Sequence, residues 1–115
     1  MAKYYDLTDV FLMSGGDNKF VKDLVSLFTD SFAEVKRSLT DALNQSNAQE
    51  IGNILHKIKP TAQLFRLHVA KDVKQLESAF KAGILDANLS QKLTALLLEL
   101  EKCVEELIDF VNGLN

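Results

Sequence analysis

His56 is the residue in this sequence whose neighbours are best suited to nucleophilic chemistry. Lys59 and Gln63 follow it by three and seven residues, so in a helix the three side chains share one face. A neutral imidazole nitrogen is a nucleophile, and an ammonium one turn away would offset the charge of an anion attached to the ring. An amide two turns away could add a hydrogen bond. The spacing therefore makes His56, Lys59 and Gln63 a candidate catalytic group.

The residues around His56 also indicate a surface for an anionic partner. Gly52, one turn before the ring, lacks a side chain and leaves room for that partner, while Pro60, one turn after it, adds a rigid ring. Lys57 is one of five basic residues in the stretch from His56 to Lys74, and the same stretch contains only one acidic residue, Asp72. The local excess is 5 − 1 = 4 positive charges in a chain of net charge −3. Lysines that simply solvate a helix are the alternative interpretation.

A helical wheel places His56 in solvent. Apolar residues follow one another at steps of three or four through this part of the chain and stay in phase across Pro60 (Ile51, Leu55, Ile58, Ala62, Phe65, Val69, Val73, Leu76 and Phe80). With about 100° of rotation per residue, His56 lies roughly 140° from the direction of that stripe. The ring is therefore expected to be exposed, although an exposed histidine without any function fits the spacing equally well.

Composition narrows the fold and the class of protein. The 115 residues are 47% apolar, with one proline and five glycines, and good helix formers dominate, which predicts an all-α domain spanning residues 1–115. Cys103 is the only cysteine, which favours a reducing compartment and a cytoplasmic location. No apolar stretch approaches the roughly 20 residues of a membrane span, and a net acidic chain disfavours nucleic-acid binding. Neither a phosphate-binding loop nor a Cys/His metal motif occurs, so no metal or cofactor is expected.

Capping residues divide the chain into helices. A short helix is expected from Asp6 or Thr8 to Gly15, and a longer one from Asp17 or Asn18 to the turn at 44–47. A third begins at Asn47, is kinked at Pro60 and is interrupted near 66–68, after which a fourth ends at Gly83. The last runs from Asp86 or Asn88 to Asn112.

The apolar faces of these helices are predicted to include Phe20 and Leu27 in the second helix and Ile108 in the last. We expect an antiparallel up-and-down four-helix bundle whose N-terminal helix covers one end.

Three segments of the sequence resemble a known family. His56-Lys57-Ile58-Lys59-Pro60-Thr61-Ala62 resembles the signature of histidine-containing phosphotransfer (HPt) domains, and Leu76-Glu77 stand about where that family has a downstream Leu-Glu pair. Ser14-Gly15-Gly16-Asp17, followed by Phe20-Val21, resembles the opening of many bacterial members. The resemblance extends from about Asp6 to Asn112. It departs from the family pattern at Pro60 and at Arg66, where many members have glycine.

The resemblance implies a phosphoryl carrier in two-component signal transduction. His56 would accept a phosphoryl group from an aspartate of a receiver domain and pass it to another receiver. The partners would be receivers of response regulators or of a hybrid sensor histidine kinase, and they would supply magnesium and most catalytic groups. The chain itself would be a monomeric carrier rather than an enzyme, without contact to nucleic acid or membrane. The alternative function is a helical adaptor that docks a signalling partner and carries no phosphoryl group.

The same resemblance suggests where a receiver docks. The surface around His56, with Gly52, Lys57 and Pro60, would meet the partner. Exposed apolar residues of the N-terminal helix, such as Val10, Phe11 or Met13, would extend this surface, or they would simply cap the core. His68 is expected to be structural or incidental, and Cys103 is expected to be a small core residue.

Overall fold

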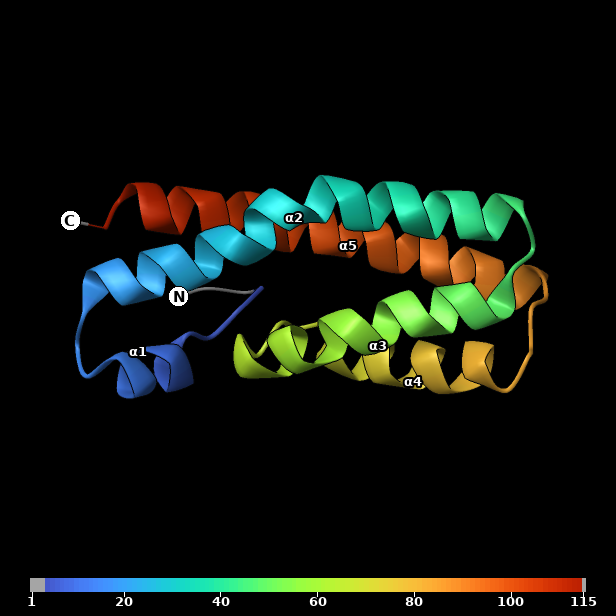
Figure 1. Cartoon of the computed structure of the whole chain (residues 1–115), viewed down its shortest axis with the longest axis horizontal. Coiled ribbons are helices and arrows are strands. Elements are labelled where there is room, and N and C mark those ends of the chain that lie inside the picture. The colour runs from blue at the N-terminus through green and yellow to red at the C-terminus, as the bar shows by residue number, and fades with distance from the viewer. Residues whose placement is uncertain (1–3, 115) are drawn as a thin grey trace.

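The computed structural model describes residues 4–114, and the regular secondary structure among them is entirely α-helical (Figure 1). The helices are α1 Thr8–Ser14, α2 Asn18–Asn44, α3 Ala48–Leu64, α4 Ala70–Lys81 and α5 Ala87–Asn112. The all-α class predicted from composition is confirmed. Across residues 4–114, every helix falls short of the combined length and apolarity that a bilayer crossing requires.

Three of the helices begin at polar residues that the sequence predicted as N-caps. The side chains of Asp17, Asn47 and Asp86 accept hydrogen bonds from first-turn amides of α2, α3 and α5, at 2.9, 3.1 and 2.8 Å. Each cap satisfies an amide that has no partner inside the helix, a contribution of about 1 kcal/mol. The starts of these helices are therefore determined by short-range chemistry that can be recognised in the sequence.

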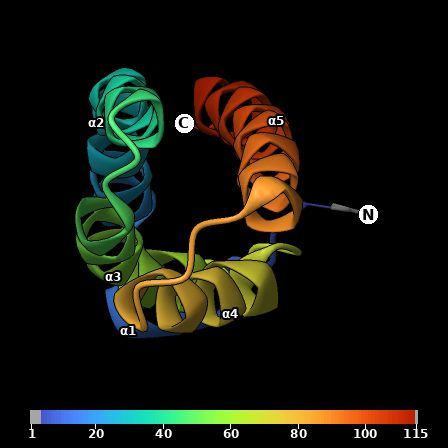
Figure 2. The ribbon, with the colours of Figure 1, turned by 90° about the vertical axis from the view of Figure 1, so that its right-hand side faces the viewer.

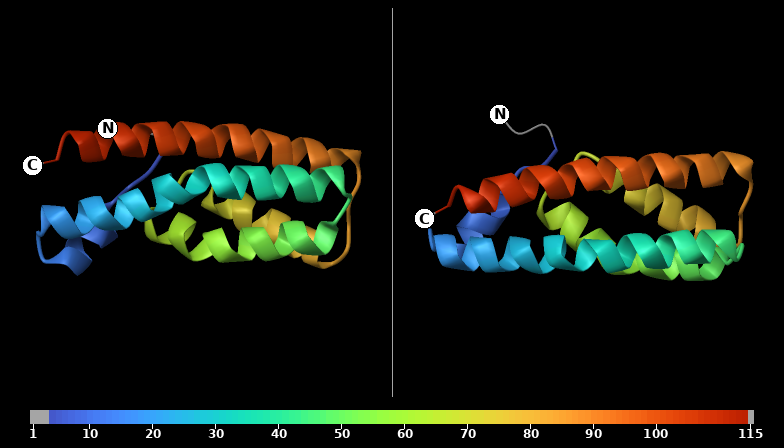
Figure 3. Two further views of the ribbon diagram at one scale, coloured as in Figure 1. Left: turned by 45° about the horizontal axis from the view of Figure 1, so that its top comes forward. Right: turned by 90° about the horizontal axis from the view of Figure 1, so that it is seen from above.

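The four longer helices surround a common apolar interior (Figure 2). Helix α2 packs against α3 and α5, α3 packs against α4, and α4 packs against α5. Figure 3 shows α2 and α5 extending along the full length of the molecule, which measures 45 × 22 × 20 Å. The short α1 packs against α2 at the end where α2 begins (Figure 1). The arrangement leaves the outer faces of α3 and α4 open to solvent.

The apolar stripe predicted through α3 and α4 forms much of this interior, and all nine of its members, from Ile51 to Phe80, are buried. The prediction was wrong for three residues on the other long helices. Phe20 and Leu27 on α2 and Ile108 on α5 have side chains that are 40%, 71% and 40% exposed. A helix with two main neighbours buries only part of its circumference, so apolar residues at the edge of its stripe stay in solvent.

Helix α3 continues across Pro60 and ends at Leu64 through backbone geometry that usually requires glycine. Arg66 has φ +46°, its amide bonds to the Gln63 carbonyl, and the Leu67 amide bonds to the Ala62 carbonyl at 2.9 Å. These two hydrogen bonds form a Schellman motif, in which the left-handed position is normally glycine. The predicted interruption between α3 and α4 is therefore confirmed, with an arginine in the strained position.

Arg66 compensates for that strain with ion pairs to the N-terminal segment. Its guanidinium lies 3.2 Å from Asp6 and 3.0 Å from Asp9, and all three side chains are about half exposed. The left-handed conformation costs a non-glycine residue about 1–2 kcal/mol, whereas exposed ion pairs contribute below about 1 kcal/mol each. The two effects are therefore of similar size and opposite sign.

We expect Arg66→Gly to change the free energy of unfolding by less than about 1 kcal/mol, because relief of strain offsets the lost ion pairs. Arg66→Ala loses the ion pairs and keeps the strain, so it should be clearly less stable than Arg66→Gly. Urea denaturation of both variants at low and high salt measures this difference. An Arg66→Gly protein that is less stable than Arg66→Ala would contradict the explanation.

Candidate functional site

His56 lies on the outer face of α3, as the helical wheel predicted. Its side chain is 57% exposed, while Leu55 and Ile58 on either side of it are buried in the interior. Pro60 and Gln63, one and two turns further along the same face, are also exposed. The imidazole therefore stands on a solvent-accessible ridge of α3.

Glu77 of α4 is the buried group that organises this ridge. It is the only charged residue in the buried part of the described chain, and its side chain is 7% exposed. One carboxylate oxygen, Oε2, lies 2.7 Å from His56 Nδ1 and 3.4 Å from Lys81 Nζ. The other oxygen, Oε1, lies 2.9 Å from Lys59 Nζ. We refer to His56, Lys59, Glu77 and Lys81 as the Glu77 cluster.

The cluster keeps the Glu77 carboxyl ionised. Burial alone would raise its pKa, but the hydrogen bonds from Lys59, His56 and Lys81 outweigh burial and lower that pKa to about 2. A buried carboxylate is stable only when its oxygens are paired in this way. At neutral pH Glu77 is therefore an anion that can accept hydrogen bonds and has no proton to donate.

The ionised carboxylate fixes the tautomer of His56. Because Glu77 can only accept, His56 Nδ1 must carry the hydrogen and donate it across the 2.7 Å contact. In the neutral ring the lone pair is then on Nε2. A carboxylate bound to one ring nitrogen also restricts rotation of the imidazole. The site thus presents an oriented nitrogen nucleophile on an exposed ring.

The structure changes the roles expected for two of the three candidate catalytic residues. Lys59 pairs with Glu77 and is 25% exposed, so in this state its charge is already engaged by a carboxylate. Gln63 is exposed, and the imidazole donates its hydrogen bond to Glu77 instead. Glu77 appeared in the sequence analysis only as part of a Leu-Glu pair. The feature of the sequence that could have identified Glu77 is its position, because this charged residue falls on the apolar stripe of α4 together with Val73 and Phe80.

Gly52 has a packing role rather than the predicted role at an open docking surface. It is buried, and a Cβ added there would lie 2.7 Å from Lys81 Cγ and 3.1 Å from the Lys81 backbone nitrogen. The missing side chain therefore lets α4 and the stem of Lys81 pass close to α3. The room that glycine leaves is filled by this chain and not by a partner.

We expect Gly52→Ala to lower the free energy of unfolding by about 1–2 kcal/mol, although alanine is the better helix former by about 1 kcal/mol. The added methyl meets both the side chain and the backbone of Lys81, so α3 and α4 must move apart. Thermal unfolding followed by circular dichroism measures the change. Gly113→Ala serves as the control, because Gly113 is exposed and a Cβ added there would lie no closer than 3.5 Å to its neighbours. A Gly52→Ala protein that is more stable than the wild type would contradict the packing assignment.

The residues proposed for partner docking lie in different environments. Lys57 and Pro60 are exposed beside His56. Val10 is fully buried, which corrects the expectation that it is exposed, and Phe11 is half-buried with its ring edge against Phe110. Met13 is 61% exposed. The exposed apolar surface of α1 is therefore at its C-terminal end, where Leu12, 75% exposed, adjoins Met13.

The second histidine, His68, packs between Glu99, Cys103 and Tyr4. His68 Nε2 lies 2.9 Å from Glu99, its Nδ1 lies 3.6 Å from Cys103 Sγ, and its ring packs edge-on against Tyr4. Burial, and next the charge of Glu99, raise the pKa of the Cys103 thiol to about 12, so this sulfur is not an activated nucleophile. The contacts of His68 with Glu99 and Cys103 therefore join the segment between α3 and α4 to helix α5.

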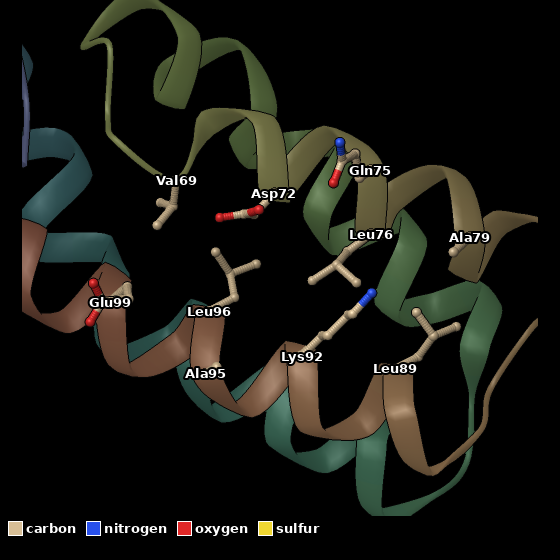
Figure 4. A pocket seen from close by; sticks show the side chains of 10 residues that line it. All are labelled: Val69, Asp72, Gln75, Leu76, Ala79, Leu89, Lys92, Ala95, Leu96 and Glu99. Atoms are coloured by element: carbon tan, nitrogen blue, oxygen red, sulfur yellow. The ribbon is translucent and has the colours of Figure 1, made fainter.

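A cavity of about 400 Å³ lies between α4 and α5 (Figure 4). Leu76 and Leu96 face into it from opposite helices, and Asp72, Lys92 and Glu99 contribute polar groups to its lining. His56 and Glu77 are not among the residues that line it. The cavity is therefore separate from the Glu77 cluster.

No family model matches the chain, and neither a curated protein nor a solved structure matches it.

Proposed function

We propose that this chain is a phosphorelay intermediate that accepts a phosphoryl group on His56 from a receiver-domain aspartate and passes it to another receiver. The observation that carries the proposal is the exposed imidazole whose Nδ1 is bound to a buried, ionised Glu77, which leaves the Nε2 lone pair available. Residues 1–115 then form one cytoplasmic HPt-like domain, an antiparallel four-helix bundle capped by α1.

The groups of the Glu77 cluster can account for every bond and charge in the transfer step. The Nε2 lone pair attacks phosphorus in line, the N–P bond forms, and the bond from phosphorus to the aspartyl oxygen breaks with its electron pair leaving on the carboxylate. Because Nδ1 keeps its hydrogen, the phosphorylated ring becomes positively charged, and Glu77 compensates that charge across 2.7 Å. No proton has to leave the site. The reverse step hands the phosphoryl group to a second receiver and restores the lone pair.

The proposal makes this chain a carrier rather than an enzyme. Its contribution is an oriented nucleophile and nearby ammonium groups, while the receiver domain supplies the magnesium ion and the acidic residues that bind it. Positioning is the main effect available to a surface site of this kind, because an exposed imidazole cannot exclude water by itself. The receiver must therefore cover His56 during transfer.

Apolar surface beside His56 supports docking of a receiver. A groove of about 340 Å³ runs between α2 and α3, and its lining includes Leu27 on α2 and Lys57, the residue after His56. Leu27 is 71% exposed, and the exposed Leu12 and Met13 lie on α1, which packs against α2. Scattered apolar residues are common on protein surfaces, whereas an apolar groove next to a reactive side chain favours an interface.

The same surface also favours the alternative function, a helical adaptor that binds a signalling partner without carrying a phosphoryl group. Leu12, Met13 and Leu27 could serve such an adaptor, and the exposed Pro60 one turn from His56 would hinder close approach to the ring. The two functions differ in whether His56 is phosphorylated.

Potassium phosphoramidate, which phosphorylates histidine without a partner protein, provides the test. The wild-type chain should acquire one phosphoryl group that is labile in acid and stable in base. His56→Gln should abolish it while the helical circular dichroism is retained, and the matched control His68→Gln should keep it. A label that persists in His56→Gln, or a wild-type chain that acquires none, would overturn the proposal and leave the adaptor.

A further inference from the structure

The two lysines that bind Glu77 are not equivalent. Lys59 comes from α3, lies 2.9 Å from Oε1 and is 25% exposed. Lys81 comes from the last turn of α4, lies 3.4 Å from Oε2 and is 37% exposed. A contact of 3.4 Å is at the long end for an ammonium and a carboxylate, so Lys81 is held more weakly. Oε2 is also the oxygen bound by His56 Nδ1, which places the Lys81 ammonium on the imidazole side of the carboxylate.

Gly52 explains how Lys81 reaches this position. The Lys81 stem passes over α3 where a Cβ on residue 52 would be 2.7 Å from Lys81 Cγ. Gly52 lies one helical turn before His56, so the two residues share a face of α3. Any side chain at position 52 would push the lysine away from that face. The close approach of α4 to α3 therefore directs this particular ammonium toward the ring.

On the basis of the proposed function, the geometry points to Lys81 as the residue that binds the phosphoryl group of phosphorylated His56, while Lys59 stays with Glu77. Phosphorylation gives the ring a positive charge and so strengthens its bond to Oε2, and it adds anionic oxygens at Nε2. The Lys81 ammonium has three rotatable donors on a flexible stem, and it exchanges one long contact for short bonds to those oxygens. The covalent step remains the one already described.

Phosphorus NMR of the chain phosphorylated with phosphoramidate tests this assignment. A cation beside the phosphoryl group favours ionisation to the dianion and so lowers the pH at which the dianion takes up a proton. Lys81→Gln should therefore weaken this ionisation about two- to fivefold, a rise of about 0.3–0.7 pH units in the titration midpoint. Lys81→Arg should restore the wild-type midpoint, and Gly52→Ala should shift it in the same direction as Lys81→Gln.

Lys74→Gln is the matched control, because Lys74 is exposed two turns earlier on α4 and lies outside the Glu77 cluster. It should leave the midpoint unchanged. A phosphorylated wild type with the same midpoint as Lys81→Gln would overturn the role of Lys81, as would a shift in Lys59→Gln alone. A wild type that shows no phosphohistidine signal would contradict the proposed function itself, so the two failures are distinguishable.

Discussion

Glu77→Gln is expected to slow phosphoryl acceptance by His56 about 10- to 100-fold. The glutamine amide can donate to Nδ1, which moves the ring hydrogen to Nε2 and removes the lone pair that attacks phosphorus. The variant also lacks the negative charge that compensates the phosphorylated imidazolium. Hydrogen bonds to charged groups contribute about 1.5–3 kcal/mol, which corresponds to the expected factor. The initial rate of labelling by phosphoramidate, followed by phosphorus NMR, measures it.

Glu99→Gln is the matched control for this experiment. Glu99 also binds a histidine, His68, at 2.9 Å, but it lies outside the Glu77 cluster. Its replacement should leave the labelling rate unchanged. Nitrogen NMR should in addition show the Nδ1–H tautomer of His56 in the wild type and a larger share of the Nε2–H tautomer in Glu77→Gln. Equal labelling rates in the wild type and Glu77→Gln would show that the carboxylate does not prepare the nucleophile.

The second large effect is a loss of stability in acid that depends on Glu77. Hydrogen bonds from Lys59, His56 and Lys81 overcome the effect of burial and lower the Glu77 pKa from 4.5 to about 2 in the folded state. Between these values the unfolded chain binds more protons than the folded chain, so stability falls as pH falls through this window. Above it the contribution is fully present, and there we expect Glu77→Gln to be less stable than the wild type by about 1–3 kcal/mol.

Urea unfolding across a pH series measures this contribution. The stability difference between the wild type and Glu77→Gln should be constant above about pH 5 and should shrink as the pH is lowered toward about 2. Taking the difference removes the titration of the other carboxyl groups, which the two proteins share. A difference that stays constant down to about pH 2 would mean that Glu77 is not held ionised by the cluster.

Features determined by neighbours in the sequence could be predicted. Asp17, Asn47 and Asp86 cap their helices through residues two or three positions away, and the exposure of His56 follows from the phase of one helix. An interruption near 66–68 was predicted as well, and α3 ends just before it at Leu64, although the apolar pattern stays in phase across the break.

Features that depend on the crossing of two helices could not be predicted. Glu77 is 21 residues from His56, and a carboxylate on the apolar stripe of α4 is recognised as its partner only when α4 is placed against α3. Gly52 was interpreted as open space because Lys81, which fills that space, is 29 residues away. Leu27 was assigned to the interior because periodicity identifies an apolar face without showing how much of it a neighbouring helix covers.

Transfer of radioactive phosphate from receiver domains of the same genome shows whether His56 carries a phosphoryl group between receivers. Each receiver is first labelled on its aspartate with acetyl phosphate and then mixed with this chain. We expect that at least one receiver passes its label to the wild-type chain as an acid-labile, base-stable phosphoryl group, that a second receiver removes it, and that His56→Gln takes up none. Label that never leaves the receivers, or that reaches His56→Gln as readily as the wild type, would contradict this expectation.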